Sequence, residues 1–366
     1  MPRKGLLSEN GLKQVSIKEV REGSILATNI HSKGKTLFRR GHKLLRRDIT
    51  FLRNAGLRAI PIADADSDTF KTGTISEETR EEAVTVVTNV LNDFENLNPK
   101  KYEAVRNVAD KMVDEILQSK DLKIQAHDLR TYDEYTYRHS VNVTAISVAI
   151  ARLMHWDARD LRTLAAGALV HDIGKMKIPY EVLRKEARLD VEERRIIEQH
   201  TVWGFDLLSS RNVGSPHEWA VTRQHHETLD GRGYPDGRMG DEMHPWAKIV
   251  AVADIWDALR SNRPYKQGWP SDRVLKLLNS DEMREKLDPA SLEVMNQIAV
   301  PYTHGTQVKL SNGEIAVVVE QNPVNPFLPV VRVIRDGAGK ELNGDGPVYS
   351  LQKEYEIDIV ETVIGG

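Results

Sequence analysis

The sequence predicts a multidomain, mainly α-helical protein: a small α+β N-terminal module, a large all-helical domain and a β-rich C-terminal appendage. Three observations support this fold class. Short strand-like runs flank one helical pattern near the N-terminus, helical periodicity dominates from Thr131 onward, and strand periodicity with hairpin turns follows Pro301. The predicted parts are the N-terminal module at 1–66, a linker with connecting helices at 67–125, the helical domain at 126–301 and the appendage at 302–366.

The N-terminal module is predicted from short strands at 15–17, 24–27 and 58–62 and a helix at 47–56. The helix is expected to end with Gly56 at its C′ position. A basic cluster falls in the same region, formed by Arg39, Arg40, Arg46 and Arg47. We interpret this cluster as a solvated basic face, with an anionic ligand as the alternative.

Helix-start signals organise the middle of the chain. Ser76 and the Asn98-Pro99 pair predict two connecting helices. Asp190 and Glu193 have the spacing of a capping box. Further helices are predicted at 135–154, 161–172, 190–208, 216–226 and 246–259, and two more begin at Ser271 and Asp288. In the appendage, strands are predicted at 307–310, 316–320, 329–334 and 355–359, separated by Asn-Gly and Asp-Gly turns.

Composition excludes several classes of protein. The net charge of −3 gives no indication of a nucleic-acid polymer as partner. Cysteine is absent, so disulfides, thiolate metal sites and cysteine nucleophiles are excluded, and any metal must use nitrogen and oxygen ligands. The N-terminus lacks the apolar core of a signal peptide, and no apolar stretch is long enough to span a bilayer. We therefore expect a cytoplasmic protein without a membrane partner.

The most informative stretch is HHETLDGRGYP at 225–235, because adjacent histidines beside acids and a glycine-rich turn are not typical of a core helix. Other ligand-type residues lie within apolar runs of the helical domain, where an unpartnered carboxylate costs several kcal/mol. A divalent cation would remove that cost. The candidate ligands are His139, His171, Asp172, His200, His225, His226 and Asp254.

The ligand types indicate the metal and its chemistry. Five imidazoles and two carboxylates suit iron, manganese or zinc better than calcium or magnesium. Seven ligands exceed what one ion with an open position takes from protein, so two ions bridged by Asp172 fit the count. Two such ions can clamp a phosphate, and metal-assisted phosphoester hydrolysis is the predicted chemistry.

Three motifs resemble the HD-GYP subfamily of the HD phosphohydrolase superfamily: HDIGK at 171–175, HHETLDGRGYP at 225–235 and DALRSNRPYK at 257–266. The resemblance covers about 131–301. It implies an all-helical HD-type, metal-dependent phosphohydrolase domain. The N-terminal module resembles the small domain often found ahead of HD-GYP domains.

The resemblance implies a cyclic di-GMP phosphodiesterase that yields pGpG and often GMP, although some members act on cyclic GMP-AMP. The seven candidate residues would be the metal ligands, and a hydroxide bridging the metals at Asp172 would be the nucleophile. Lys175 would stabilise the phosphate charge. Arg263 and Lys266 resemble residues that hold the second phosphate or a guanine, with a solvated helix end as the alternative. The GYP loop, with Gly233, Tyr234 and Pro235, resembles a surface that contacts partners such as diguanylate cyclase domains.

One position departs from the family pattern. Some members carry a glutamate one helical turn before the first histidine, where it supports a third metal, but Tyr135 stands there in this sequence. We therefore expect a binuclear site, with Tyr135 contacting substrate or packing. Iron is predicted from the resemblance, and ligand type also permits manganese. The alternatives are a cyclic dinucleotide receptor without turnover, a phosphodiesterase for cyclic GMP-AMP, or a phosphohydrolase acting on nucleotides or ppGpp. The oligomeric state is left open by the sequence, and a homodimer is one possibility.

Overall fold

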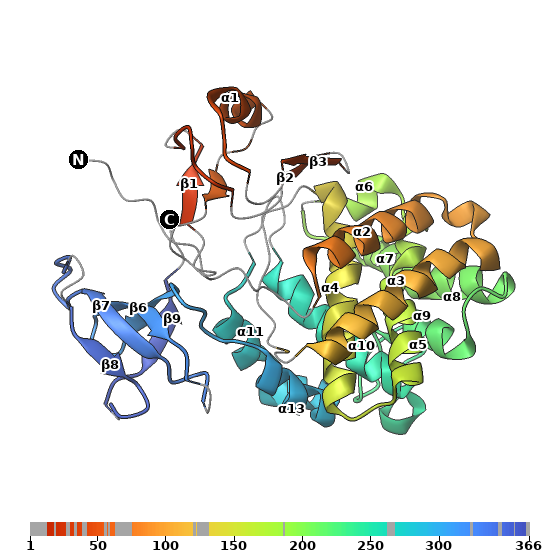
Figure 1. Cartoon of the computed structure of the whole chain (residues 1–366). Coiled ribbons are helices and arrows are strands. Elements are labelled where there is room, and N and C mark those ends of the chain that lie inside the picture. The colour runs from red at the N-terminus through yellow and green to blue at the C-terminus, as the bar shows by residue number, and fades with distance from the viewer. Residues whose placement is uncertain are drawn as a thin grey trace.

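The computed structural model describes residues 13–17, 20–26, 30–32, 35–38, 42–54, 57, 59–62, 75–119, 122, 132–185, 187–261, 268–322, 325–342, 346–354 and 356–363. Figure 1 shows three bodies: a small N-terminal module, a large group of helices and a C-terminal sheet. This mainly helical arrangement with a β-rich appendage confirms the predicted fold class.

The N-terminal module combines two antiparallel strand pairs with one helix. Strand β1 (Lys13–Ser16) pairs with β4 (Ala59–Ile62), and β2 (Ile30–Ser32) pairs with β3 (Lys35–Phe38). Helix α1 (Arg46–Asn54) completes it, and the apolar core includes Leu26, Leu44, Leu52 and Ile60. The Arg46 and Arg47 side chains are 89% and 83% exposed, as a solvated basic face requires. Arg39, Arg40 and Gly56 lie outside the described residues.

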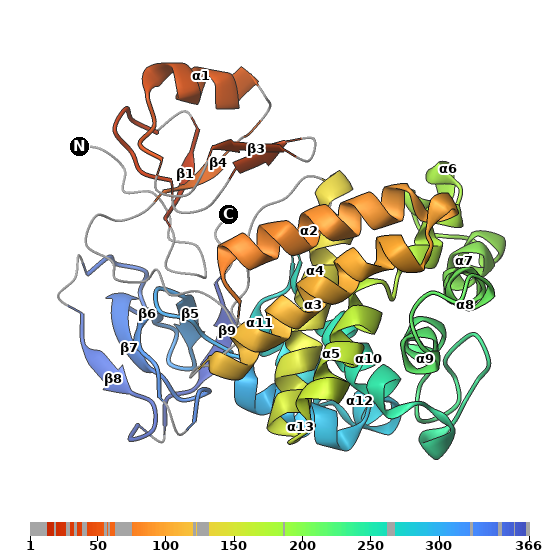
Figure 2. The same ribbon diagram turned by 45° about the vertical axis from the view of Figure 1, so that its right-hand side comes forward.

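Two helices connect the module to the helical domain and pack directly on it. Helix α2 (Glu77–Asn92) is capped by Ser76, whose side chain accepts the Thr79 N–H, and a short 3-10 turn η1 (Phe94–Asn96) follows. Helix α3 (Pro99–Gln118) has Asn98 as its N-cap and Pro99 at its first position. Both helices contribute to the same apolar core as the helices that follow. Figure 2 shows them lying across α4 and α5.

The helical domain is built around three buried helices, α4 (Tyr132–Leu153), α5 (Ala158–Leu169) and α10 (Pro245–Arg260). The remaining elements surround them: η2 (Ile173–Lys177), α6 (Tyr180–Leu183), α7 (Val191–Glu198), α8 (His200–Ser210), α9 (Pro216–Gln224), η3 (Gly240–Glu242), α11 (Ser271–Leu278), α12 (Asp281–Lys286) and α13 (Pro289–Ile298). None of the described helices combines the length and the apolar character needed to cross a membrane.

The helix predicted over 190–208 is divided in two at Gln199. The predicted capping box at Asp190 and Glu193 opens α7 as expected. Two side chains then take carbonyls at the end of that helix: His200 Nδ1 lies 2.7 Å from the Ile197 oxygen, and Thr201 Oγ1 donates to the Glu198 oxygen at 3.0 Å. These two side-chain bonds lie at the junction where α7 ends and α8 begins.

The C-terminal appendage is one five-stranded antiparallel sheet with the order β8-β7-β6-β5-β9. Its strands are β5 (Gln307–Leu310), β6 (Ile315–Glu320), β7 (Val330–Arg335), β8 (Val348–Ser350) and β9 (Ile359–Thr362). Two details differ from the sequence prediction: β8 was not predicted, and the last strand was placed at 355–359. Pairing with β5, in which Val308 faces Thr362, fixes the last strand further along the chain.

Candidate metal centre

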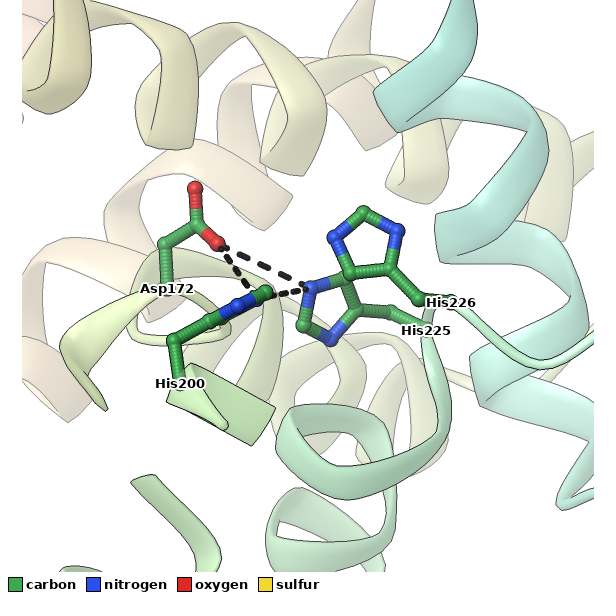
Figure 3. Close-up of side chains that lie close together, drawn as sticks. All are labelled: Asp172, His200, His225 and His226. Carbon is green, nitrogen blue, oxygen red and sulfur yellow. Dashed lines mark hydrogen bonds and ion pairs between the residues drawn. The ribbon is translucent and has the colours of Figure 1, made fainter. Parts of the chain in front are cut away.

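The structure brings together all seven residues predicted as metal ligands. They come from α4 (His139), the segment after α5 (His171, Asp172), the start of α8 (His200), the segment after α9 (His225, His226) and α10 (Asp254). They form two groups, one of Asp172, His200, His225 and His226, drawn in Figure 3, and one of His139, His171 and Asp254. Within each group, the ligand atoms lie within 4.8 Å of one another.

Asp172 stands between the two groups. Its Oδ1 atom lies 3.3 Å from His200 Nε2 and 3.6 Å from His225 Nε2. Its Oδ2 atom faces the other group, 3.4 Å from His171 Nε2 and 3.9 Å from His139 Nε2. One carboxylate therefore presents one oxygen to each group.

Asp254, on helix α10, is the third member of the second group. Its Oδ1 atom lies 2.9 Å from His139 Nε2, and its Oδ2 atom lies 3.8 Å from His226 Nδ1. His226 thus contacts a residue of each group, since it also stands beside His200 with ring centroids 5.1 Å apart.

Outer contacts turn four of the imidazoles so that Nε2 faces the centre. The Nδ1 atom of His139 lies 2.8 Å from the Asp257 carboxylate. The other three Nδ1 atoms contact backbone carbonyls: His171 with Ala168 at 2.7 Å, His200 with Ile197 at 2.7 Å and His225 with Thr222 at 3.0 Å. In a neutral imidazole only one nitrogen carries the proton, and with that proton on Nδ1 and bonded to its outer acceptor, Nε2 has a lone pair for a metal.

The electrostatics keep these groups in their ligand forms. Burial would raise the pKa of Asp172, but the Lys175 ammonium and the neighbouring imidazoles hold it well below its usual range. Burial lowers the pKa of His225 to about 4, against the pull of the Asp172 carboxylate. Burial, together with neighbouring His225, also lowers the pKa of His226. At neutral pH these two imidazoles are therefore neutral and able to coordinate.

Two buried polar atoms at the centre indicate a cation. Among the described residues, neither Nε2 of His171 nor Oδ1 of Asp172 has a hydrogen-bond partner. A buried group without a partner costs about 1–3 kcal/mol. Nitrogen and carboxylate ligands aimed at one point are what a divalent transition metal takes. The residues present therefore fit a pair of bound metal ions.

Lys175 reaches the same carboxylate from the 3-10 turn η2. Its Nζ atom lies 2.5 Å from Asp172 Oδ2, and its side chain is 24% exposed whereas that of Asp172 is 1% exposed. The turn is held against α8, because a Cβ atom on Gly174 would lie 1.9 Å from the His200 oxygen. Lys175 therefore places a positive charge against the buried carboxylate from a partly exposed position.

The GYP loop covers one flank of the centre. The Tyr234 ring stacks on His226 at 4.8 Å between centroids and meets His200 edge-on at 6.2 Å. Gly233 packs closely against the backbone of Glu227, because a Cβ atom added to Gly233 would lie 2.4 Å from the Glu227 Cα atom. The peptide bond between Tyr234 and Pro235 is cis.

Sequence reasoning missed the roles of two residues that support the ligands. Buried Asp257 orients His139, and buried Glu227 accepts the N–H groups of Asp236 at 2.7 Å and Arg238 at 3.0 Å, which fixes the loop. The signal for Asp257 was present, because it shares a helix face with Asp254 three residues earlier. Glu227 was recognised as an acceptor beside the histidine pair, but its partners are backbone N–H groups of a loop, which no residue type marks.

Three predicted substrate contacts are not placed by the structure. Arg263 and Lys266 lie outside the described residues. Tyr135 belongs to helix α4, but its side chain is outside the described part of the chain. Their roles stay predictions.

The fold and the cluster define a helical protein whose buried imidazoles and carboxylates fit a two-metal centre. Residues 111–291 match the family model of the HD domain, and residues 307–365 match that of the KOW domain associated with HD domain. The chain therefore contains an HD domain, as the motifs predicted, and its β-rich appendage is a KOW domain.

Several named relatives match part of the chain. A cyclic di-GMP phosphodiesterase of Pseudomonas aeruginosa is 34% identical over 212 residues, which are 58% of this chain and 51% of that protein. The cyclic di-GMP phosphodiesterase of Thermotoga maritima is 40% identical over 153 residues, 40% of each chain. The 3'3'-cGAMP-specific phosphodiesterase 3 of Vibrio cholerae is 34% identical over 175 residues, 46% of this chain and 37% of that protein. The chain spans about half or less of the length of these relatives.

A solved structure shows the same fold. A HDG"Y"P protein from Bdellovibrio bacteriovorus superposes with a TM-score of 0.51 and 20% sequence identity, covering 78% of this chain and 99% of that chain.

Proposed function

We propose that this chain is a metal-dependent phosphodiesterase that hydrolyses cyclic di-GMP to pGpG. The observation that carries the proposal is the arrangement of seven nitrogen and oxygen ligands in two adjacent groups, with the buried carboxylate of Asp172 facing both groups. Relatives named as cyclic di-GMP phosphodiesterases support the substrate class. Two divalent ions, which we assign as iron with manganese as the alternative, would polarise the phosphodiester and activate water.

The protein's own residues have separate tasks in this proposal. His139, His171, His200, His225, His226 and Asp254 would hold the ions, with Asp172 shared between them. Lys175, which lies beside Asp172 and is partly exposed, would neutralise charge that develops on the phosphate. The Tyr234 ring, stacked on His226, would shield that ligand from water. Contact of the GYP loop with a diguanylate cyclase domain stays a prediction.

The test is anaerobic incubation of the protein with cyclic di-GMP and Fe(II) or Mn(II), followed by chromatography of the products. We expect pGpG from the wild type. Asp172→Ala should lose at least about 100-fold in turnover, because a direct ligand contributes more than the outer partners worth 10- to 100-fold. Lys175→Met should keep its metals and lose about 100-fold in kcat.

Other outcomes separate the alternatives. Faster turnover of 3'3'-cGAMP than of cyclic di-GMP would assign the chain to the substrate of its Vibrio cholerae relatives. Tight dinucleotide binding with two bound metals and no turnover would contradict the enzyme and support a receptor.

A further inference from the structure

A row of hydrogen bonds connects helix α2 to the metal-ligand candidate His139. Arg80 in α2 donates from its guanidinium to the Asn142 Oδ1 atom at 2.7 Å. Asn142 donates through Nδ2 to the Asp257 Oδ1 atom at 2.8 Å. The Asp257 Oδ2 atom lies 2.8 Å from His139 Nδ1, and His139 Nε2 faces Asp254 at 2.9 Å. This row of hydrogen bonds therefore runs from Arg80 on α2 through Asn142 on α4 and Asp257 on α10. It ends at His139, which lies on α4 at the metal centre.

The middle of the row admits only one orientation of the amide. A guanidinium offers only donors and a carboxylate only acceptors, so the oxygen of Asn142 must face Arg80 and its nitrogen must face Asp257. Asp257 in turn accepts the His139 Nδ1–H, which leaves the lone pair of Nε2 toward the ions. Asn142 thus helps to orient Asp257, which also accepts from Ser261 Oγ at 3.1 Å, and Asp257 orients His139.

The position of Arg80 in α2 is one where a positive charge destabilises the helix. It stands near the N-terminus of α2, where the helix dipole repels positive charge, and the residue is only 7% exposed. The Glu77 carboxylate offsets part of this cost at 3.7 Å. Packing of α2 on α4 alone does not require such a residue, because the neighbouring pair of Glu81 with Arg138 at 2.8 Å already joins the two helices.

We propose that Arg80 is a positioning residue for the metal centre and acts on His139 through Asn142 and Asp257. Arg80 precedes the HD domain match, which begins at residue 111. The helix that follows the N-terminal module therefore contributes to the orientation of a metal ligand in the helical domain. The inference rests on the two-ion centre of the proposed function and not on its substrate.

The test measures metal affinity. Metal-free full-length protein is titrated with Mn(II) against a fluorescent chelator, and its thermal unfolding is recorded separately. Arg80→Met should weaken the tighter Mn(II) site roughly 10-fold, the lower end of the range for outer partners of metal ligands, because Arg80 acts through two intermediates. Arg80→Lys retains a cationic donor and should recover most of the affinity.

Glu81→Ala is the matched control, because it breaks the adjacent contact between α2 and α4 without touching the row. It should lower the unfolding temperature and leave the Mn(II) affinity within twofold of the wild type. Asn142→Leu should weaken binding at least as much as Arg80→Met, and the double variant should bind as Asn142→Leu does, because both changes break one row.

Equal loss of affinity in Arg80→Met and Glu81→Ala would overturn the proposal, because the effect would then belong to the helix interface. Wild-type affinity in Arg80→Met, or additive losses in the double variant, would overturn it too. If wild-type protein binds two ions but cleaves no cyclic dinucleotide, the proposed function fails while the role of Arg80 is still decided by the titration.

Discussion

Three of the candidate ligands stand where helices end, and their outer nitrogens contact backbone carbonyls in the last turns of those helices. His171 contacts the Ala168 oxygen at the end of α5, and His225 contacts the Thr222 oxygen at the end of α9. His200 contacts Ile197 in the last turn of α7. Each of these contacts turns the Nε2 atom of the imidazole toward the centre.

This detail explains why the sequence predicted the residues but not their orientation. Histidines and aspartates within apolar runs indicate a metal site by their chemistry alone. The proton on each ring depends on which oxygen lies beside Nδ1, and for these three rings that oxygen belongs to the backbone. No residue type marks such a partner, so only the folded chain defines it.

Burial of the imidazoles makes the stability of the metal-free protein depend on pH. The pKa of His225 is about 4 in the folded protein and about 6.5 in an unfolded chain, so the unfolded state binds more protons between these values. Stability is fully present above pH 6.5 and is lost as pH falls toward 4, on the order of 3 kcal/mol from this residue. The lowered pKa of His226 acts in the same direction.

Urea unfolding of EDTA-treated protein between pH 7 and 4.5 checks this prediction. The midpoint should fall with pH in the wild type and fall less steeply in His225→Gln, which has no titrating ring. Equal slopes in the two proteins would show that His225 is not buried in its neutral form.

At the scale of elements, local chemistry predicted where helices begin better than where they end. Ser76, Asn98 and Asp190 cap their helices as their residue types predicted, because each accepts the backbone N–H three residues onward. The break at Gln199 was not predictable from periodicity, since apolar residues continue through it. Side-chain bonds from His200 and Thr201 accompany it, and no residue pattern marks them in advance.

The GYP loop depends on one buried carboxylate. Glu227 is 1% exposed and accepts the N–H groups of Asp236 and Arg238, and bonds to a charged acceptor contribute about 1.5–3 kcal/mol. Glu227→Ala should therefore speed hydrogen exchange of these two amides by roughly 10- to 100-fold.

Exchange measured by mass spectrometry on peptides covering residues 228–239 tests this. Arg232→Ala is the control, because the Arg232 side chain is 83% exposed and its removal should leave exchange unchanged. Unaltered exchange in a folded Glu227→Ala variant would mean that other contacts hold the loop.

At the scale of the whole molecule, the C-terminal sheet is attached to the helical domain through a buried polar contact. Thr362 in β9 donates to the Asp272 carboxylate of α11 at 2.9 Å, and both residues are buried. Figure 1 shows this strand on the side of the sheet that faces α11. The sequence predicted the appendage from its turns and alternation, but its docking depends on a pair of residues 90 positions apart, which no local pattern reveals.

Removing that contact should loosen the appendage. Thr362→Val leaves a buried carboxylate oxygen without a donor and should lower the free energy of unfolding by about 1–3 kcal/mol. Val360→Thr, on the same strand at a side chain that is 52% exposed, should change it by less than about 0.5 kcal/mol. Calorimetry of both variants, with limited proteolysis near residue 302, provides the comparison, and equal stability would contradict a docking role for Thr362.

The two-metal centre is tested most directly by counting metals. The protein is reconstituted with Fe(II) without oxygen, freed of unbound metal and measured by elemental mass spectrometry. Two ions per wild-type chain, and no more than one in Asp172→Ala, is the expected result. A wild-type chain that holds no ion, or only one at saturation, would contradict the assignment of His139, His171, Asp172, His200, His225, His226 and Asp254 as ligands of two metals.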